Sequence, residues 1–244
     1  MSKHIKLLVA LVLAALLLLG VIAFSCCCVE VLPGRLDDIE TELYYQSLSE
    51  DSQGMIIRDG SSKETGDLVF SDDLLCWITI DGSLTYPVMK ASDDGSFYLD
   101  HRPDGKRSAS GSLFVRGNGY QTDNIIVYGH NMRNGKMFGI LKKFKNRNWA
   151  EEHRMVMITD KQGIHRYEVF AVVVESISGR KLKWEKFIGM NEEKAEQYGI
   201  IARKLSVVDL GNNKSEISAS RYLTLVTCDY SVPEGRLVVI AREV

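Results

Sequence analysis

The sequence predicts a mainly β protein, a barrel or sandwich with helical insertions, preceded by one N-terminal transmembrane helix. From about Asp67 to the C-terminus, short runs rich in Val, Ile, Leu and aromatic residues alternate with turn-forming Gly, Asp, Asn and Ser. Two longer segments of this region repeat their apolar residues with the period of a helix. A long apolar run near the N-terminus is the third observation, and it predicts a membrane span.

The composition is that of an ordinary globular protein. The chain has 244 residues, a formal net charge of −2 and 45% hydrophobic residues, which leaves room for one domain and an appendage. Its basic residues are scattered, so the sequence indicates neither a nucleic-acid groove nor a polybasic membrane patch. We therefore expect no nucleic-acid partner.

Residues 1–29 are predicted to form a cytoplasmic stub and a membrane anchor. The run from Leu7 to Phe24 is 18 residues long and contains only apolar residues and Gly. As a helix it covers about 27 Å, close to the roughly 30 Å hydrocarbon core of a bilayer. Lys3 and Lys6 precede the run, whereas acidic residues predominate after it. The positive-inside rule then places the N-terminus in the cytoplasm, so we expect a single-pass protein of the cell membrane with an extracellular domain.

A cleaved signal peptide and a lipoprotein signal are the two alternatives. A signal peptide has a shorter apolar region and a small-residue cleavage site, of which AFSCCCVE offers no clean version. A lipoprotein site before Cys26 would favour a branched aliphatic residue in place of Ala23 and a residue smaller than Phe24. Cys26, Cys27 and Cys28 are interpreted as apolar interfacial residues, and acylation stays open.

Residues 30–66 are predicted to be a helical appendage and a linker. After Pro33 and Gly34, four apolar residues recur near a 3.6-residue period, namely Leu36, Ile39, Leu43 and Leu48. They predict one amphipathic helix or two. Residues 49–66 are polar and rich in Gly and Ser, which is typical of a linker, so residues 67–244 form the predicted barrel domain.

That domain contains eight predicted strands and two helical segments. The β-patterned runs are LLCWITI, YPVMK, GSLFVRG, DNIIVYGH, RMVMITD, HRYEVFAVVVES, RYLTLVT and RLVVIARE. The segment GKMFGILKKFKN places four apolar residues on one helical face: Met137, Ile140, Leu141 and Phe144. The segment NEEKAEQYGIIARKLS does the same with Ala195, Tyr198, Ile201, Ala202 and Leu205.

Cys228 is the residue that most clearly suggests chemistry. Cys76 lies in the apolar run LLCWITI and is interpreted as a small buried hydrophobe, although a disulfide between the two is allowed outside the cytoplasm. On the first interpretation Cys228 is a free thiol at the end of the run YLTLVT. A nucleophilic thiolate needs a nearby cation or hydrogen bonds that lower its pKa below about 8.5.

His130 and Arg236 could provide such groups. His130 ends the run DNIIVYGH, so its imidazole and the thiol are both expected at strand ends, where a rigid scaffold can hold two side chains face to face. Arg236 opens the strand after the turn DYSVPEG, and a guanidinium that stays charged can donate hydrogen bonds to a developing oxyanion. Spacing alone leaves a structural role open for each. The other histidines of the domain, His101, His153 and His165, are interpreted as solvated.

The pattern around Cys228 resembles the sortases, membrane-anchored cysteine transpeptidases of Gram-positive bacteria. The resemblance rests on Thr-Leu-x-Thr-Cys, here residues 224–228, on Arg236 eight residues later and on YGHNM upstream. The stretches GHNMRNGKMFGILKKF and CWITIDGSLTYPVMKASDDGSFYLDH, with the helical segment over 183–206, resemble class B. Over residues 67–244 the resemblance implies a closed barrel of about eight strands with a helix between strands six and seven.

The resemblance also implies roles for individual residues. Cys228 would be the nucleophile, His130 the catalytic histidine and Arg236 the catalytic arginine. Five further residues are expected to contact the substrate: Leu99, Asn131, Val226, Thr227 and Asp229. Val226 stands where class B enzymes commonly have Ser, and this difference concerns the groove for the sorting signal.

The implied reaction cleaves a C-terminal sorting signal of secreted proteins after Thr and passes through a thioacyl-enzyme. The implied partners are proteins with a motif of the NPxTG or NPQTN kind, and an amine of peptidoglycan precursor or cross-bridge, or a pilin lysine. No cofactor is expected, and His130 and Cys228 are too few ligands for a closed zinc site. A hydrolytic cysteine peptidase and a membrane-anchored binding domain with a structural thiol are the alternatives.

Overall fold

The computed structural model describes residues 39–48, 73–80, 82, 84–92, 95–178, 183–187, 192–210 and 221–244. The chain divides into two compact units, Met1–Tyr44 and Tyr45–Val244. Residues 39–48 are helical, where the sequence predicts a helix in the appendage. The predicted anchor and the predicted domain boundaries, after residues 29 and 66, lie outside the described residues. No helix in the described part of the chain is long and apolar enough to cross a bilayer.

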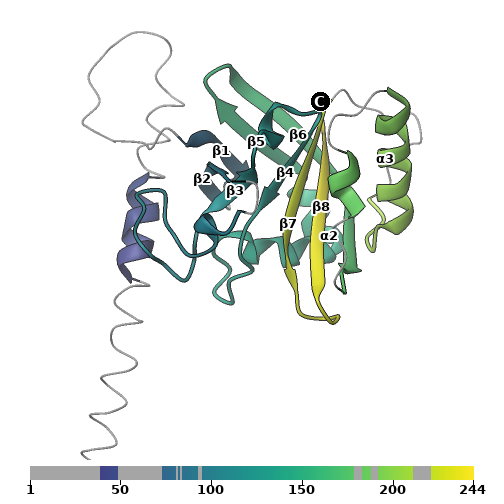
Figure 1. Cartoon of the computed structure of the whole chain (residues 1–244). Helices are drawn as coiled ribbons and strands as arrows, with labels where there is room; N and C mark the ends of the chain where they lie inside the picture. Colours follow the sequence, from purple (N-terminus) through teal and green to yellow (C-terminus); the bar gives the residue numbers. More distant parts are fainter. Residues whose placement is uncertain are drawn as a thin grey trace, which may run out of the picture. The chain divides into compact units, whose positions relative to one another are not determined.

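Eight strands close into a barrel, as predicted (Figure 1). In chain order they are β1 (Leu74–Ile80), β2 (Leu84–Ala91), β3 (Leu113–Arg116), β4 (Asn124–Tyr128), β5 (Met155–Asp160), β6 (Gly163–Ser176), β7 (Tyr222–Asp229) and β8 (Gly235–Glu243). Around the barrel the order is β1-β2-β3-β4-β7-β8-β6-β5. Because the sheet is closed, these strands present no unpaired edge to solvent.

Two neighbouring pairs in the barrel are parallel, β2 with β3 and β4 with β7. A hairpin cannot join parallel strands, so each pair needs a crossover connection. The first crossover carries the 3-10 helix η1 (Phe97–Leu99). The second is much longer and holds β5, β6 and four of the helical elements, so strands distant in sequence lie side by side at β4 and β7.

Those four elements lie on either side of the β5–β6 hairpin in the chain. Between β4 and β5 come η3 (Phe138–Lys145) and α2 (Arg147–Glu152). Between β6 and β7 come η4 (Lys183–Phe187) and α3 (Glu192–Leu205), and α3 is the helix predicted there. The first predicted helical segment is a 3-10 helix, and its four predicted apolar residues are all buried. A further short 3-10 helix, η2 (Gly119–Gln121), joins β3 to β4.

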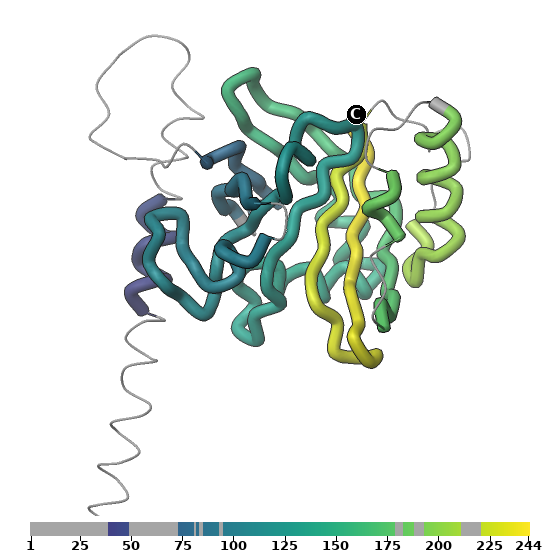
Figure 2. The backbone as a smooth tube through the Cα atoms, viewed as in Figure 1, coloured from purple at the N-terminus to yellow at the C-terminus, as the bar shows by residue number. Residues whose placement is uncertain are grey.

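A second apolar layer covers one outer face of the barrel. Trp184 and Phe187 of η4 and Tyr198 of α3 pack with residues of β4, β6, β7 and β8, among them Ile126 and Val226. Alternate residues of a strand point to opposite faces, so Ile125 and Val127 of β4 are buried on the other side. Figure 2 traces α3 along the β6 side of the barrel, where the two elements contact each other. This layer holds η4 beside β4, where the candidate site lies.

Candidate active site

A cavity of about 980 Å³ opens beside the ends of β4, β7 and β8. Its lining includes all three predicted catalytic residues, Cys228, His130 and Arg236. The other lining residues are Leu99, Phe114, Val115, Arg116, Gly119, Asn124, Ile126, Tyr128, Gly129, Ile177, Lys183, Glu185, Lys186, Val226 and Thr227. The structure therefore brings together a thiol, an imidazole and a guanidinium that the sequence separates by up to 106 residues, from 130 to 236.

Strand register accounts for this convergence. In the parallel pair β4–β7, Tyr128 lies opposite Val226. His130 and Cys228 each follow two residues later, so both lie at the same end of this strand pair. In the antiparallel pair Cys228 lies directly opposite Arg236. Side chains of directly opposed residues point to the same face of a sheet, so the thiol and the guanidinium share the cavity face.

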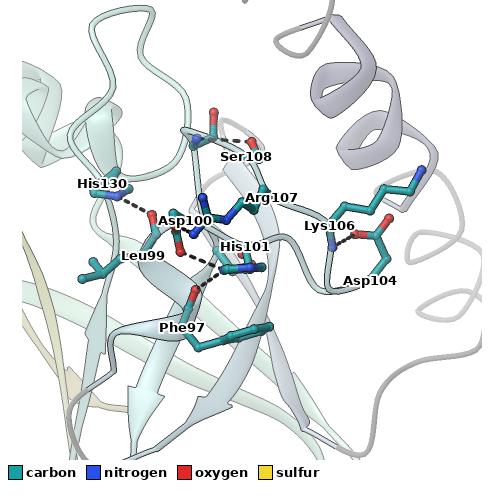
Figure 3. Close-up of polar contacts among 11 residues, drawn as sticks. Phe97, Leu99, Asp100, His101, Asp104, Lys106, Arg107, Ser108 and His130 are labelled. Carbon is teal, nitrogen blue, oxygen red and sulfur yellow. Dashed lines mark hydrogen bonds and ion pairs between the residues drawn. The ribbon is translucent and has the colours of Figure 1, made fainter.

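The ring of His130 is fixed by the segment that contains η1. Its Nε2 donates a hydrogen bond to the carbonyl oxygen of Leu99 at 2.7 Å (Figure 3). Because a carbonyl only accepts, Nε2 carries the proton, and Nδ1 of the neutral ring is the nitrogen that can take up another. The backbone of His130 is also held, since its carbonyl accepts a hydrogen bond from Phe138 N at 2.9 Å.

His101 stabilises the segment that presents Leu99. Its Nδ1 lies 2.7 Å from Asp100 Oδ1 and 2.9 Å from the Phe97 carbonyl, and its ring stacks on Phe97 at 4.0 Å (Figure 3). The interpretation of His101 as solvated is wrong, because only 17% of its side chain is exposed. The charged neighbours that suggested solvation instead provide its hydrogen-bond partner.

The other two histidines are also more enclosed than the sequence indicates. His153 is half-buried, and its ring stacks on that of Trp149 with the ring centroids 4.0 Å apart. Its Nδ1 lies 2.8 Å from the carbonyl oxygen of Trp149. The His165 side chain is 21% exposed and lies 3.4 Å from both Asp160 and Glu243. Both belong to local structure outside the cavity lining.

Cys228 is a free, half-buried cysteine whose backbone is held from the neighbouring strand. Asn131 Nδ2 donates to the Cys228 carbonyl at 2.7 Å, and the Thr227 hydroxyl donates to the Gly129 carbonyl at 2.7 Å. Cys76 is also free but only 2% exposed, and burial raises the pKa of its thiol to about 12. A disulfide between Cys76 and Cys228 is excluded, and of these two thiols Cys228 is the one placed to act as a thiolate.

Arg236 completes the set of three. It is half-buried, and its Nη1 donates to the carbonyl of Gly235 at 2.9 Å. A guanidinium offers five N–H donors, so this bond leaves others for a ligand in the cavity. Its permanent positive charge lies directly opposite Cys228 in the strand register.

A polar contact among Tyr128, Arg116 and Glu185 joins η4 to the barrel. The Tyr128 hydroxyl donates to Glu185 Oε1 at 2.8 Å, and Arg116 Nη1 lies 3.3 Å from the same oxygen. The Arg116 guanidinium carbon also lies 4.5 Å above the Tyr128 ring. Burial, followed by the hydrogen bond and charge of Glu185, raises the pKa of Tyr128 well above its ordinary value, so the hydroxyl stays protonated and donates.

The residues predicted to contact substrate divide into two groups. Leu99, Val226 and Thr227 line the cavity, whereas Asn131 and Asp229 are not among its lining residues. Asn131 bonds the Cys228 backbone, and Asp229 is 5% exposed and paired with Lys145.

Sequence reasoning missed Tyr128 and Glu185 as residues of the site. They are 57 residues apart in the chain, and only the fold makes them neighbours, so no local pattern points to them. No group of three His, Cys, Asp or Glu that could hold a metal ion occurs within the described ranges.

Comparison with known proteins agrees with this geometry. A family model described as the sortase domain matches residues 81–244. Sortase B of Listeria monocytogenes is 26% identical over 181 residues, 68% of this chain and 68% of that protein. Sortase B of Staphylococcus aureus is 25% identical over 175 residues, 70% of each.

Solved structures give the same result. The structure of Clostridium perfringens sortase B has 33% sequence identity and a TM-score of 0.61, covering 72% of this chain and 96% of that one. A Staphylococcus aureus sortase B–substrate complex shares the fold, with a TM-score of 0.70 at 23% identity, over 86% of this chain and 98% of that one.

Proposed function

The chain belongs to the sortase family, where its relatives are class B enzymes, and is thus a cysteine transpeptidase; we propose that it joins secreted proteins to a cell-surface amine. Its substrate would carry a C-terminal sorting signal of the NPxTG or NPQTN kind. The observation that carries the proposal is the convergence of Cys228, His130 and Arg236 on one cavity. Each of the three has a distinct part in the reaction.

Cys228 is the proposed nucleophile. Its thiolate attacks the carbonyl carbon of the Thr in the sorting signal and forms a C–S bond, giving a tetrahedral oxyanion. When that intermediate collapses, the peptide C–N bond breaks and a thioacyl-enzyme remains. Arg236 lies opposite Cys228 in the register, so its N–H groups are positioned to stabilise the negative oxygen.

His130 is the proposed proton carrier. In its charged form it gives a proton to the leaving amine, and the neutral ring then takes a proton from the incoming amine that attacks the thioester. The hydrogen bond of Nε2 to Leu99 supports transfer at Nδ1, because Nε2 is occupied. The new amide releases Cys228 as a thiolate, and the cycle can begin again.

The acceptor would be an amine of peptidoglycan precursor or cross-bridge, or a pilin lysine. A sortase B solved in complex with triglycine supports an amine acceptor of this kind. Both substrates would meet the enzyme at the outer membrane surface if residues 7–24 span the bilayer with the N-terminus in the cytoplasm, as the sequence favours. Tethering would then raise the encounter rate by increasing the effective concentration.

The test is a transpeptidation assay with the full-length protein. Internally quenched peptides containing NPQTN or NPQTG are incubated with and without triglycine, and products are identified by mass spectrometry. We expect cleavage after Thr and, with triglycine, a Thr–Gly conjugate. Cys228→Ala should abolish both products, and Cys76→Ala, which removes the buried thiol, should retain them.

Two results would contradict the proposal. Turnover that persists in Cys228→Ala would exclude a thioacyl-enzyme at this residue. Cleavage that yields only the free Thr acid at saturating triglycine would identify a hydrolytic peptidase toward this acceptor.

A further inference from the structure

Asp229 follows Cys228 directly, yet its carboxylate is directed into the protein. Only 5% of the side chain is exposed. Its Oδ2 forms an ion pair with Lys145 Nζ, and its Oδ1 accepts hydrogen bonds from the Ser231 hydroxyl and from Ser231 N, the latter at 2.8 Å. A buried carboxylate is tolerated only when it is paired and hydrogen-bonded, so Lys145 is the cation that permits this placement.

Lys145 reaches Asp229 from a separate element. It ends η3, whose buried side chains Phe138, Leu141 and Phe144 anchor the helix, and η3 contacts both β7 and β8. Lys145 is exposed like Lys142 and Lys143 of the same helix, and 34% of its side chain is accessible. Its Nζ nevertheless reaches a buried anion, the carboxylate of Asp229.

We propose that Lys145 is a positioning residue for the nucleophile, which it holds in place through Asp229. The ion pair fixes the chain on the C-terminal side of Cys228, while Asn131 fixes the Cys228 carbonyl at 2.7 Å. Together they set the thiol opposite Arg236 and beside His130. The proposal rests on the role of Cys228 proposed above.

The ion pair between Lys145 and Asp229 also affects the thiol of Cys228 through its charges. The charged groups around Cys228 are Arg236 from the neighbouring strand, Asp229 from its own strand and Lys145 from η3, and the imidazole of His130 lines the same cavity. Without Lys145 the negative charge of Asp229, one residue away, is no longer neutralised, and a nearby anion disfavours a thiolate. If Lys145 had only a structural role, its loss would affect stability alone. In the proposed positioning role, its loss also changes how the reactivity of Cys228 depends on pH.

The experiment compares four variants of the full-length protein: Lys145→Met, Lys145→Arg, Lys142→Met and the double variant Lys145→Met/Asp229→Asn. Two quantities are measured for each, kcat/KM with the quenched NPQTN peptide and triglycine, and the rate of Cys228 alkylation by iodoacetamide between pH 5 and 10. Mass spectrometry assigns the label to Cys228. Circular dichroism confirms that each variant is folded.

We expect Lys145→Met to lower kcat/KM on the order of 100-fold, the size of effect that a displacement of about 1 Å can have. Its alkylation profile should move to higher pH. Lys145→Arg keeps the charge and should restore both values to within a few-fold, and Lys142→Met should match the wild type. The double variant removes both charges, so its alkylation profile should return toward that of the wild type.

An unchanged alkylation profile in folded Lys145→Met would overturn the proposal, as would a Lys142→Met variant with the same defect. If Lys145→Met does not fold, the alkylation profile of the double variant is the test. A double-variant profile displaced to higher pH than that of the wild type would also overturn the proposal. Alkylation needs no turnover, so these results remain distinct from the Cys228→Ala test of the reaction itself.

Discussion

The hydroxyl of Tyr128 donates a 2.8 Å hydrogen bond to the carboxylate of Glu185, and both residues line the cavity that contains Cys228. Tyr128 ends the strand that leads to His130, and Glu185 belongs to η4. The contact therefore joins the element that forms one wall of the cavity to the strand that presents the histidine. We therefore expect loss of this bond to change the position of the cavity wall that η4 forms.

Tyr128→Phe should raise KM for the sorting peptide and leave kcat within about twofold, because it alters binding to ground state and transition state alike. A hydrogen bond to a charged group contributes about 1.5–3 kcal/mol, and about 1.4 kcal/mol is tenfold in KM. Because the bond lies within the protein, only part of this energy acts on peptide binding, and we expect a rise of about tenfold in steady-state assays. Tyr120→Phe is the matched control, since it removes a hydroxyl bonded to Asp160 at 2.6 Å outside the cavity lining. A fall in kcat at constant KM would contradict this role.

Arg236→Lys should lower kcat and leave KM nearly unchanged. Lysine keeps the positive charge but loses the planar set of donors that can meet an oxyanion opposite Cys228. Loss of one oxyanion donor typically costs about 100- to 1,000-fold in kcat. Arg242→Lys, on the same strand but paired with Glu168, serves as the control in the same kinetic assay. Equal effects of the two substitutions would argue against a specific role for Arg236.

Cys228 and Cys76 should differ sharply in reactivity. Burial raises the pKa of the Cys76 thiol to about 12, so near pH 8 it is neutral as well as inaccessible. Iodoacetamide should label Cys228 within minutes in the native protein and Cys76 only after unfolding in urea. Peptide mapping by mass spectrometry measures both sites in one sample. Native labelling of Cys76 would show that β1 opens far more readily than its burial indicates.

Asp160 should contribute stability that is lost in acid. Burial raises its pKa, but hydrogen bonds from the Tyr120 hydroxyl and from backbone amides outweigh this and hold the pKa below the ordinary 3.8. The contribution is complete above pH 3.8 and disappears as the pH falls through the folded-state pKa. Asp160→Asn should therefore lower the free energy of unfolding by about 1–3 kcal/mol at pH 7. Below pH 4 the free energy of unfolding of this variant should fall less steeply with decreasing pH than that of the wild type. Urea titrations from pH 7 to pH 2 measure both quantities, and parallel curves would refute the prediction.

The sequence predicted those parts of the structure that depend on local pattern. Alternating apolar residues identified the strands, and the strand-end positions of Cys228, His130 and Arg236 indicated a shared site. The contacts of Glu185 and Lys145 could not be predicted, because each joins residues far apart in the chain through strand order and helix docking. His101 was misinterpreted for a related reason, since its charged neighbours pair with it instead of leaving it in water.

The parallel pairing of β4 with β7 also has a consequence for biosynthesis. β7 enters between β4 and β8, and 98 residues separate His130 from Cys228, so closure needs contacts between distant parts of the chain. A ribosome-bound chain that lacks residues 222–243 has no sulfur beside the imidazole. The site is therefore complete only after both β7 and β8 have been synthesised and have joined the barrel.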